Sequence, residues 1–362
     1  MAGCRQHQHP ARDRRGLAHR RGRDARREWV TQTVGSIAGV AGTGITLGGG
    51  SLTTGEATST SFDGAIGGAG TITKTGSGTW TLSGANSYTG ATTISGGTLQ
   101  IGNGGATGTL GSGAVIDNST LEFKRSDSYT VANAISGTGA VIQSGTGTTV
   151  LTGTNTFTGT TTVSAGTLEA AGAGTMGSTA GIAVNNGGTL LLSGTGNRIN
   201  DAATVNLNGG KIDVGGALEG NGVSSLDGMG ALTLSLNSTI DFTGIGSLMF
   251  ASGTYSAGTL SILNWNGSPL TAGVDGTNDR LMFQGNDAER MTFLSAFSQS
   301  SVAFNGFSSG YTAIQFDSSH FEIVPVPEPS SVAVAMGLLG IIGWRERRKT
   351  LQAREMERRV LG

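Results

Sequence analysis

Cysteine, proline and charged residues are scarce in this chain of 362 residues. It has one cysteine, Cys4, so an internal disulfide framework is excluded. It has five prolines, and only 13% of its residues are charged, well below the usual share in globular domains. Glycine is abundant instead, with 64 residues. Because glycine and threonine are poor helix formers, the composition favours short strands joined by tight turns.

Basic residues are nearly absent from the body of the chain. Nine arginines lie in residues 1–30 and seven basic residues in 345–362, which leaves seven basic against eighteen acidic residues in 31–344. The body therefore carries a net charge of about −11. A surface without a basic stripe lacks the phosphate contacts that nucleic acids require, so we expect no nucleic-acid binding by the body.

A stretch at residues 65–100 returns without a gap at residues 134–169, 69 residues later. AIGGAGTITKTGSGTWTLSGANSYTGATTISGGTLQ aligns with AISGTGAVIQSGTGTTVLTGTNTFTGTTTVSAGTLE, and about half of the positions are identical. Such self-similarity indicates stacked units that complete one another's core. A low-complexity spacer is the alternative, but spacers do not keep apolar residues at a fixed phase. We predict an all-β fold, a parallel β-helix (β-solenoid) with several rungs in each 69-residue unit.

Polar and apolar residues alternate in the first copy, as they do in half-buried strands. The pattern occurs at residues 71–75 and 79–83. We expect six side chains to point into the core: Ile72, Trp80, Leu82, Ile94, Leu99 and Ile101. In the second copy Thr149 replaces Trp80, and Val150 moves an apolar group to the other face, so we expect that coil to pack differently.

Asn86 and Asn155 occupy the same position in the two copies. Two interpretations are open: a row of ligand contacts on the surface, or turn residues. We favour turn residues, because asparagine tolerates left-handed backbone and hydrogen-bonds to its own neighbours.

The composition divides the chain into five parts. We expect a disordered, Arg-rich segment at 1–33. It does not contain the apolar run of a signal peptide, which suggests that the start of the reading frame is misassigned. The β-solenoid is predicted at 34–236. A closing β region, a C-terminal cap rich in aromatic residues, is predicted at 237–324. A segment with prolines, an apolar run and a basic cluster at 325–349 and a charged tail at 350–362 follow.

Residues for catalysis or metal binding are not gathered in the sequence. The seven cations of the body are scattered, and His320 is the only histidine outside the N-terminal segment. No nucleophile triad, zinc motif or phosphate-binding loop is present. We therefore predict no catalytic, cofactor or metal site and no enzyme activity. The alternative is a carbohydrate-active β-helix enzyme, a lyase or hydrolase, which would need carboxylates and a cation clustered on one face.

The C-terminal region has the arrangement of a membrane-tethered tail. Prolines at 325, 327 and 329 prevent helix, and an uncharged run, VAVAMGLLGIIGW, follows at 332–344. This run predicts a short hydrophobic helix of about 20 Å, which is less than the bilayer core of about 30 Å. A basic stop follows it at Arg345, Arg347, Arg348 and Lys349. The order of extended spacer, apolar helix and basic stop predicts a segment that associates with a membrane.

These residues resemble two known families. Pro327, Glu328 and Pro329, with the apolar run and the arginines, resemble a PEP-CTERM sorting signal, which an exosortase processes. GSGTWTLSGANSYTGATTISGGTL and GTGTTVLTGTNTFTGTTTVSAGTL resemble autotransporter-associated β-strand repeats of secreted passengers. The resemblance implies export, tethering by the tail, and release to the envelope or the exopolysaccharide. We expect a non-enzymatic surface or matrix protein, with the exosortase-type enzyme, the membrane and exopolysaccharide as partners.

Overall fold

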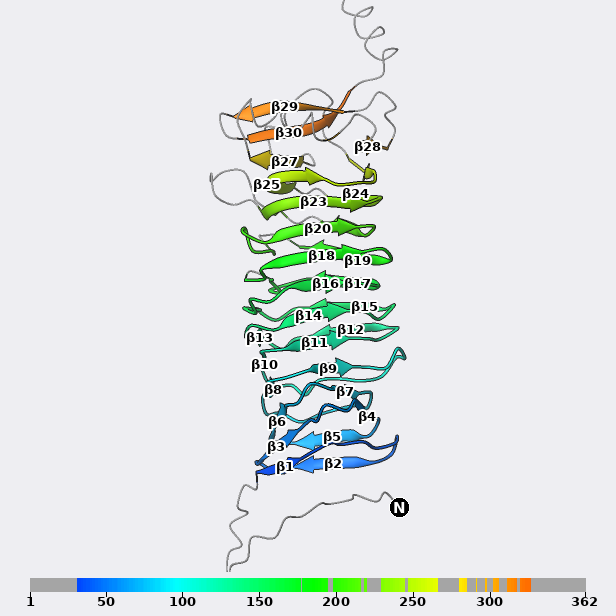
Figure 1. Cartoon of the computed structure of the whole chain (residues 1–362), viewed down its shortest axis with the longest axis vertical. Coiled ribbons are helices and arrows are strands. Elements are labelled where there is room, and N and C mark those ends of the chain that lie inside the picture. Colours follow the sequence, from blue (N-terminus) through cyan, green and yellow to red (C-terminus); the bar gives the residue numbers. More distant parts are fainter. Residues whose placement is uncertain are drawn as a thin grey trace, which may run out of the picture.

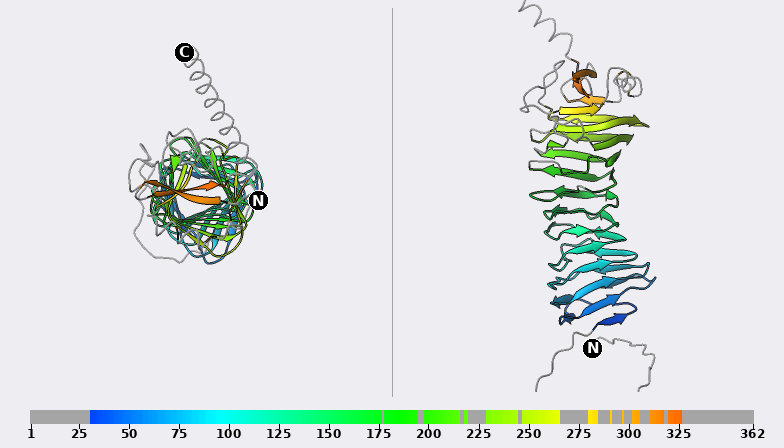
Figure 2. Two further views of the ribbon diagram at one scale, coloured as in Figure 1. Left: turned by 90° about the horizontal axis from the view of Figure 1, so that it is seen from above. Right: turned by 90° about the vertical axis from the view of Figure 1, so that its left-hand side faces the viewer.

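The computed structural model describes residues 31–326, except for 177, 195–197, 216–217, 220–228, 245–246, 266–279, 285–290, 292–296, 298–301, 306–310 and 318–319. The elements of the described part are strands, β1 to β30, and they wind into a long stack of coils (Figure 1). Seen along the stack, the strands surround one central core (Figure 2). The predicted all-β parallel solenoid is confirmed.

Three parallel sheets run along the stack, because each strand pairs with the equivalent strand of the next coil. The first sheet consists of β1 (Gln32–Val34), β3 (Ser51–Thr54), β6 (Thr71–Lys74), β8 (Thr92–Ile94), β10 (Val115–Asp117) and β13 (Ile135–Ser136). A separate pair, β2 (Gly44–Leu47) and β5 (Ala65–Gly68), lies at the N-terminal end of the stack.

The second sheet is the longest and has 14 strands. It contains β4 (Thr60–Phe62), β7 (Thr79–Leu82), β9 (Thr98–Ile101), β11 (Thr120–Phe123), β14 (Ala140–Gln143), β16 (Thr161–Val163), β18 (Gly181–Asn185), β20 (Thr204–Asn208), β22 (Leu218–Glu219), β23 (Met229–Leu236), β25 (Ser247–Tyr255), β27 (Arg280–Gln284), β29 (Tyr311–Asp317) and β30 (His320–Pro325).

The third sheet begins further along the chain and has eight strands. It contains β12 (Ser128–Val131), β15 (Thr148–Leu151), β17 (Gly166–Ala170), β19 (Gly188–Ser193), β21 (Lys211–Gly215), β24 (Ser238–Asp241), β26 (Leu260–Leu263) and β28 (Val302–Phe304).

The core is built by the predicted alternation. All six side chains expected to point inward are at most 2% exposed: Ile72, Trp80, Leu82, Ile94, Leu99 and Ile101. In the second copy Thr149 is buried and Val150 lies on the outer face, as expected. The buried hydroxyl of Thr149 donates a hydrogen bond to the side-chain Oε1 of Gln143 at 2.7 Å, so this polar residue has a partner inside the core.

The aligned glycines Gly76 and Gly145 both lie too close to the preceding coil for a Cβ, and Gly76 has a second constraint as well. Gly76 has a φ of 66°, in the left-handed region that favours glycine. At Gly145 a Cβ would overlap the main chain of Arg125 on the preceding coil. Turns that look equivalent in the sequence therefore share one constraint and differ in another.

The 69-residue repeat corresponds to three coils and one further side of the solenoid. Ile72 of β6 lies in register with Thr92, then Val115, then Ile135, which is three steps along the first sheet. The residue aligned with Ile72 is Val141, which lies in β14 of the second sheet. In the same way, β7 of the second sheet corresponds to β15 of the third. The prediction of several rungs per unit is confirmed, and the second copy is turned onto the next side.

Parallel coils continue beyond residue 236. Strands β24, β26 and β28 extend the third sheet, and β25 and β27 extend the second. The direction changes only at β30, which pairs antiparallel with β27 and β29 and covers the end of the core. The rings of Phe283 and Phe321 stack there with centroids 5.7 Å apart. The region 237–324 therefore contains further coils as well as the closing strands.

Candidate functional site

The residues of the predicted sorting signal lie outside the described part of the chain. These are Pro327, Glu328 and Pro329, the run at 332–344, and the basic stop at Arg345, Arg347, Arg348 and Lys349. Among the residues that the structure does describe, none forms a helix with the length and apolar character needed to cross a membrane.

Threonines form straight rows along the outer surface of the coils. Neighbouring strands pair in register, so equivalent outward side chains lie about 4.8 Å apart along the stack. One row follows the first sheet, with Thr33, Thr53, Thr73 and Thr93. Similar rows follow the second sheet (Thr79, Thr98, Thr120) and the third (Ser128, Thr148, Thr167, Thr189). Each hydroxyl can both donate and accept a hydrogen bond.

Charge is distributed unevenly over the three sheets. The outer face of the described strands of the first sheet carries no charged side chain, because Lys74 and Asp117 both point inward. The third sheet carries the charged network of the coils. Lys211 Nζ lies 2.8 Å from Asp213 Oδ2 and 2.7 Å from Asp241 Oδ2.

Neighbouring side chains complete the Lys211 network. Asn264 donates to Asp241 Oδ1 at 2.6 Å, and the Thr243 hydroxyl donates to Asp213 Oδ1. Burial acts to lower the pKa of Lys211, but the hydrogen bonds to the two carboxylates outweigh it and raise the pKa above its usual value. A charged lysine is not a general base, and all four carboxylate oxygens already have partners. The arrangement therefore acts as a clasp between β21 and β24.

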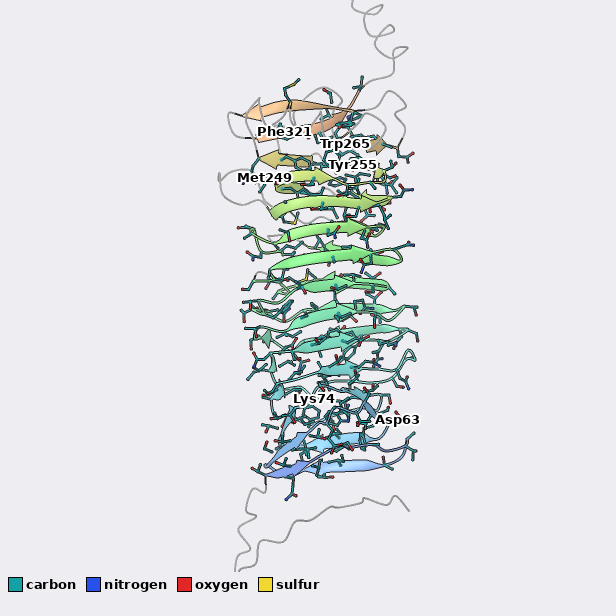
Figure 3. The ribbon with its side chains drawn as sticks, viewed as in Figure 1. Asp63, Lys74, Met249, Tyr255, Trp265 and Phe321 are labelled. Atoms are coloured by element: carbon teal, nitrogen blue, oxygen red, sulfur yellow. The ribbon has the colours of Figure 1, made fainter. Side chains whose placement is uncertain are left out.

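Lys74 is a buried cation that has no carboxylate partner among its hydrogen bonds. The side chain is 1% exposed. Figure 3 labels it among the coils of the N-terminal half of the stack. Its ammonium group donates to the carbonyls of Thr75 at 2.5 Å, Gly76 at 2.9 Å and Gly96 at 3.0 Å. Burial lowers the pKa of Lys74. The aligned residue Gln143 donates in a similar way to the carbonyls of Gly145 and Gly147 in the turn that follows it, so both copies place a long donor at this corner.

Asn86 and Asn155 join successive coils. The Asn86 side-chain oxygen accepts from the main-chain N–H of Ile66, and its amide donates to the carbonyl of Thr109. Asn155 makes the same two bonds, to Ile135 and Thr175. Both are buried and neither has a positive φ. The turn interpretation was wrong about the partners, which lie on the coils before and after instead of beside the asparagine.

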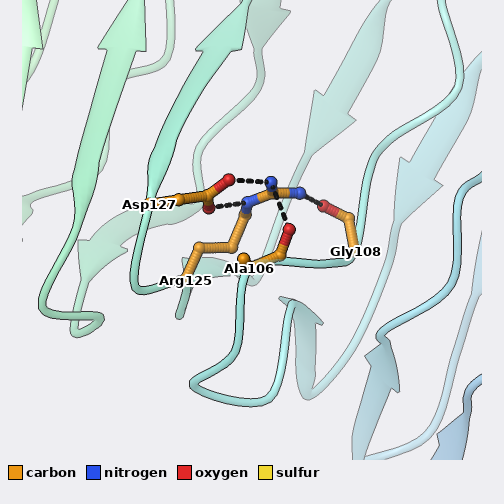
Figure 4. Close-up of polar contacts among 4 residues, drawn as sticks. All are labelled: Ala106, Gly108, Arg125 and Asp127. Atoms are coloured by element: carbon orange, nitrogen blue, oxygen red, sulfur yellow. Dashed lines mark hydrogen bonds and ion pairs between the residues drawn. The ribbon is translucent and has the colours of Figure 1, made fainter.

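An arginine covers the long turn after each repeat. The Arg125 guanidinium donates to the carbonyls of Gly108 and Ala106 and to the Asp127 carboxylate (Figure 4). It also lies over the Tyr129 ring, 4.8 Å from the centroid. Arg198 donates to the carbonyls of glycines 172 and 174 after the second copy. Two cations that look scattered in the sequence thus have matching structural roles.

Comparison with known proteins agrees with this architecture. The passenger-associated-transport-repeat model matches residues 72–101 and 141–170. No curated protein and no solved structure matches the chain. The chain contains two autotransporter-associated β-strand repeats, and with the β-solenoid they fit a passenger-like exported protein.

The two copies provide a test of the Lys74 site. Lys74→Gln places the second copy's residue at this corner, so we expect a change in the free energy of unfolding of less than about 1 kcal/mol. Lys74→Met removes the donor from three main-chain carbonyls and should cost about 1–3 kcal/mol. Denaturant unfolding measures both. Equal losses in the two variants would contradict the assigned role.

The stability of these variants should depend on pH differently from that of the wild type. Because the pKa of Lys74 is lowered in the folded state, the unfolded chain binds more protons between that lowered pKa and 10.5. The contribution of Lys74 to the free energy of unfolding of the wild type therefore rises with pH across that window. We expect Lys74→Gln to lack this contribution.

Proposed function

We propose that this chain is an exported, non-enzymatic surface or extracellular-matrix protein whose solenoid displays hydroxyl-rich faces for adhesion to polysaccharide. The observation that supports it most is that both passenger-associated repeats form core-building coils of one continuous solenoid. A long, regular scaffold of this kind suits display of a surface more than enclosure of a substrate.

The first sheet is the face best suited to a neutral glycan. Its row of Thr33, Thr53, Thr73 and Thr93 offers hydroxyl groups and methyl groups without charge. A polysaccharide presents many hydroxyl groups, and a hydroxyl on the protein can serve each as donor or acceptor. Individual contacts of this kind are weak, but a row of them engages a polymer repeatedly.

The C-terminal tail supplies the proposed route to the envelope. Its proline-rich spacer, apolar run and basic stop suit an anchor that an exosortase-type enzyme recognises at Pro327, Glu328 and Pro329. The predicted helix at 332–344 is short for a permanent span, which is consistent with transient tethering.

The alternative, a carbohydrate-active β-helix enzyme, draws little support from the clasp at Lys211. Glycoside hydrolysis needs one carboxyl group that gives a proton and another that attacks or activates water. Asp213 and Asp241 instead share one charged lysine, and their remaining oxygens accept from Thr243 and Asn264. We therefore keep adhesion as the proposed function.

Removal of hydroxyl groups tests the adhesive face. Thr53, Thr73 and Thr93 would be changed together to alanine, with Thr148, Thr167 and Thr189 of the third sheet changed in a matched control. At about 0.5–1.5 kcal/mol for each lost hydrogen bond, we expect binding to neutral extracellular polysaccharide to fall about tenfold or more in the first variant only. Retained binding in that variant, or absence of binding by the wild type, would refute the proposal.

The sorting role of the tail has a separate test. Residues 327–349 would be deleted from a chain that carries a working export signal, and the protein followed in envelope and medium fractions. We expect the deleted protein to be exported but lost from the envelope, because its anchor and recognition motif are gone. Substitution of Thr350 to alanine, outside the signal, serves as the control. Unchanged envelope retention after the deletion would refute this role.

A further inference from the structure

Asp117 places a carboxyl group inside the core of the solenoid. It is the last residue of β10 and is 0% exposed. In the first sheet it lies in register with Ile94 of β8, which points into the core as well. Gly139 packs against its carboxyl group so closely that a Cβ there would overlap Oδ1. Water therefore does not reach this side chain in the closed coil.

The carboxyl group of Asp117 is incompletely paired. Oδ1 accepts a hydrogen bond from the main-chain N–H of Ser119 at 3.0 Å, whereas Oδ2 has no hydrogen-bond partner. Burial raises the pKa of Asp117 to about 6, although main-chain N–H groups of Ser119 and Leu121 act to lower it. An ionised carboxylate in such surroundings is costly, and the neutral acid is favoured.

No cation offsets this cost among the described residues around Asp117. Neither β8 nor β13 presents a charged side chain to it, and Glu122 of β11 lies on the outer side, where it accepts from Ser144. Lys74 points into the core from β6, two strands away, and its ammonium group donates to main-chain carbonyls. Asp117 thus has no nearby charge to stabilise its ionised form.

The strand next to Asp117 is the shortest of the first sheet. β13 has two residues and is the last strand of that sheet, and it pairs with β10 through Val115 and Ile116 only. Main-chain hydrogen bonds next to this pairing, from Gly139 to the Asp117 carbonyl and from Thr156 to the Ile135 carbonyl, also hold these coils to their neighbours. The destabilised carboxylate therefore sits beside the shortest strand of the sheet, within a coil that other bonds hold closed.

We propose that Asp117 is a proton-operated latch, which keeps β10 packed between β8 and β13 when protonated and favours local opening of this coil when ionised. The direction of the pH dependence follows from the difference in proton binding between the closed coil and the unfolded chain. The folded coil holds a proton that the unfolded chain has already released between about pH 4 and pH 6, so closure is favoured at low pH and loses stability as pH rises through 6. The solenoid is then tighter in mildly acidic surroundings than in neutral ones.

Hydrogen exchange on the full chain tests the latch. Exchange of the main-chain amides in residues 115–117 and 135–136 would be followed at pH 5 and pH 7.5 and corrected for intrinsic rates. We expect protection in the wild type to fall about tenfold, because the opening equilibrium rises about tenfold for each pH unit between the pKa values of the open and closed states and levels off above about pH 6. Asp117→Asn should show no such change, and Glu56→Gln, at an exposed acid, should behave as the wild type.

If Asp117→Asn does not fold, a measurement on the wild type alone still tests the latch. Infrared spectroscopy would follow the protonated carboxyl band during a pH titration. A carboxyl group that loses its proton near pH 6 supports the latch. Titration of every carboxyl group near pH 4, constant protection in the wild type, or the same loss of protection in Asp117→Asn would overturn it.

Discussion

The pairing of each coil with the next is the constraint on which the whole structure depends. A single coil has unpaired main-chain groups on both edges and an apolar interior open at both ends, and only its neighbours can satisfy them. The consequences are seen in buried side chains that join coils, such as Asn86 and Asn155. They are also seen at Gly145, where the preceding coil leaves no room for a Cβ. The closing strands β29 and β30 cover the stack at its C-terminal end.

The phase of the repeat changes how the sequence similarity is understood. Since 69 residues make three coils and one further side, Thr73 on the first sheet corresponds to Ile142 on the second. Equivalent outer residues of the two copies therefore face different directions. Equivalent inner residues, such as Leu99 and Leu168, both remain in the core. The repeat is thus a unit of packing, and the adhesive surface proposed here arises from the register between coils, not from the alignment of the copies.

Much of the fold could be predicted from the sequence because it depends on local alternation. Ile72, Trp80 and Leu82 follow a period of two, and their burial needs no knowledge of distant residues. The roles of Lys74, Arg125 and Asp117 could not be predicted, because each also depends on residues about 20 positions away, on another coil or turn. The sequence did hold a clue to the role of Lys74. It aligns with Gln143, so both copies have a long hydrogen-bond donor at this position. The tail at 327–349 remains a prediction from its resemblance alone.

Cross-linking of introduced cysteines tests the central claim most directly, in a chain where Cys4 is replaced by serine. Register partners lie about 4.8 Å apart, within the range that a disulfide spans. Cysteines at Thr73 and Thr93, and in a second variant at Ile142 and Thr162, should cross-link readily. Cysteines at the aligned positions Thr73 and Ile142 should not. Cross-linking between those two aligned positions, or its failure in both register pairs, would contradict the account.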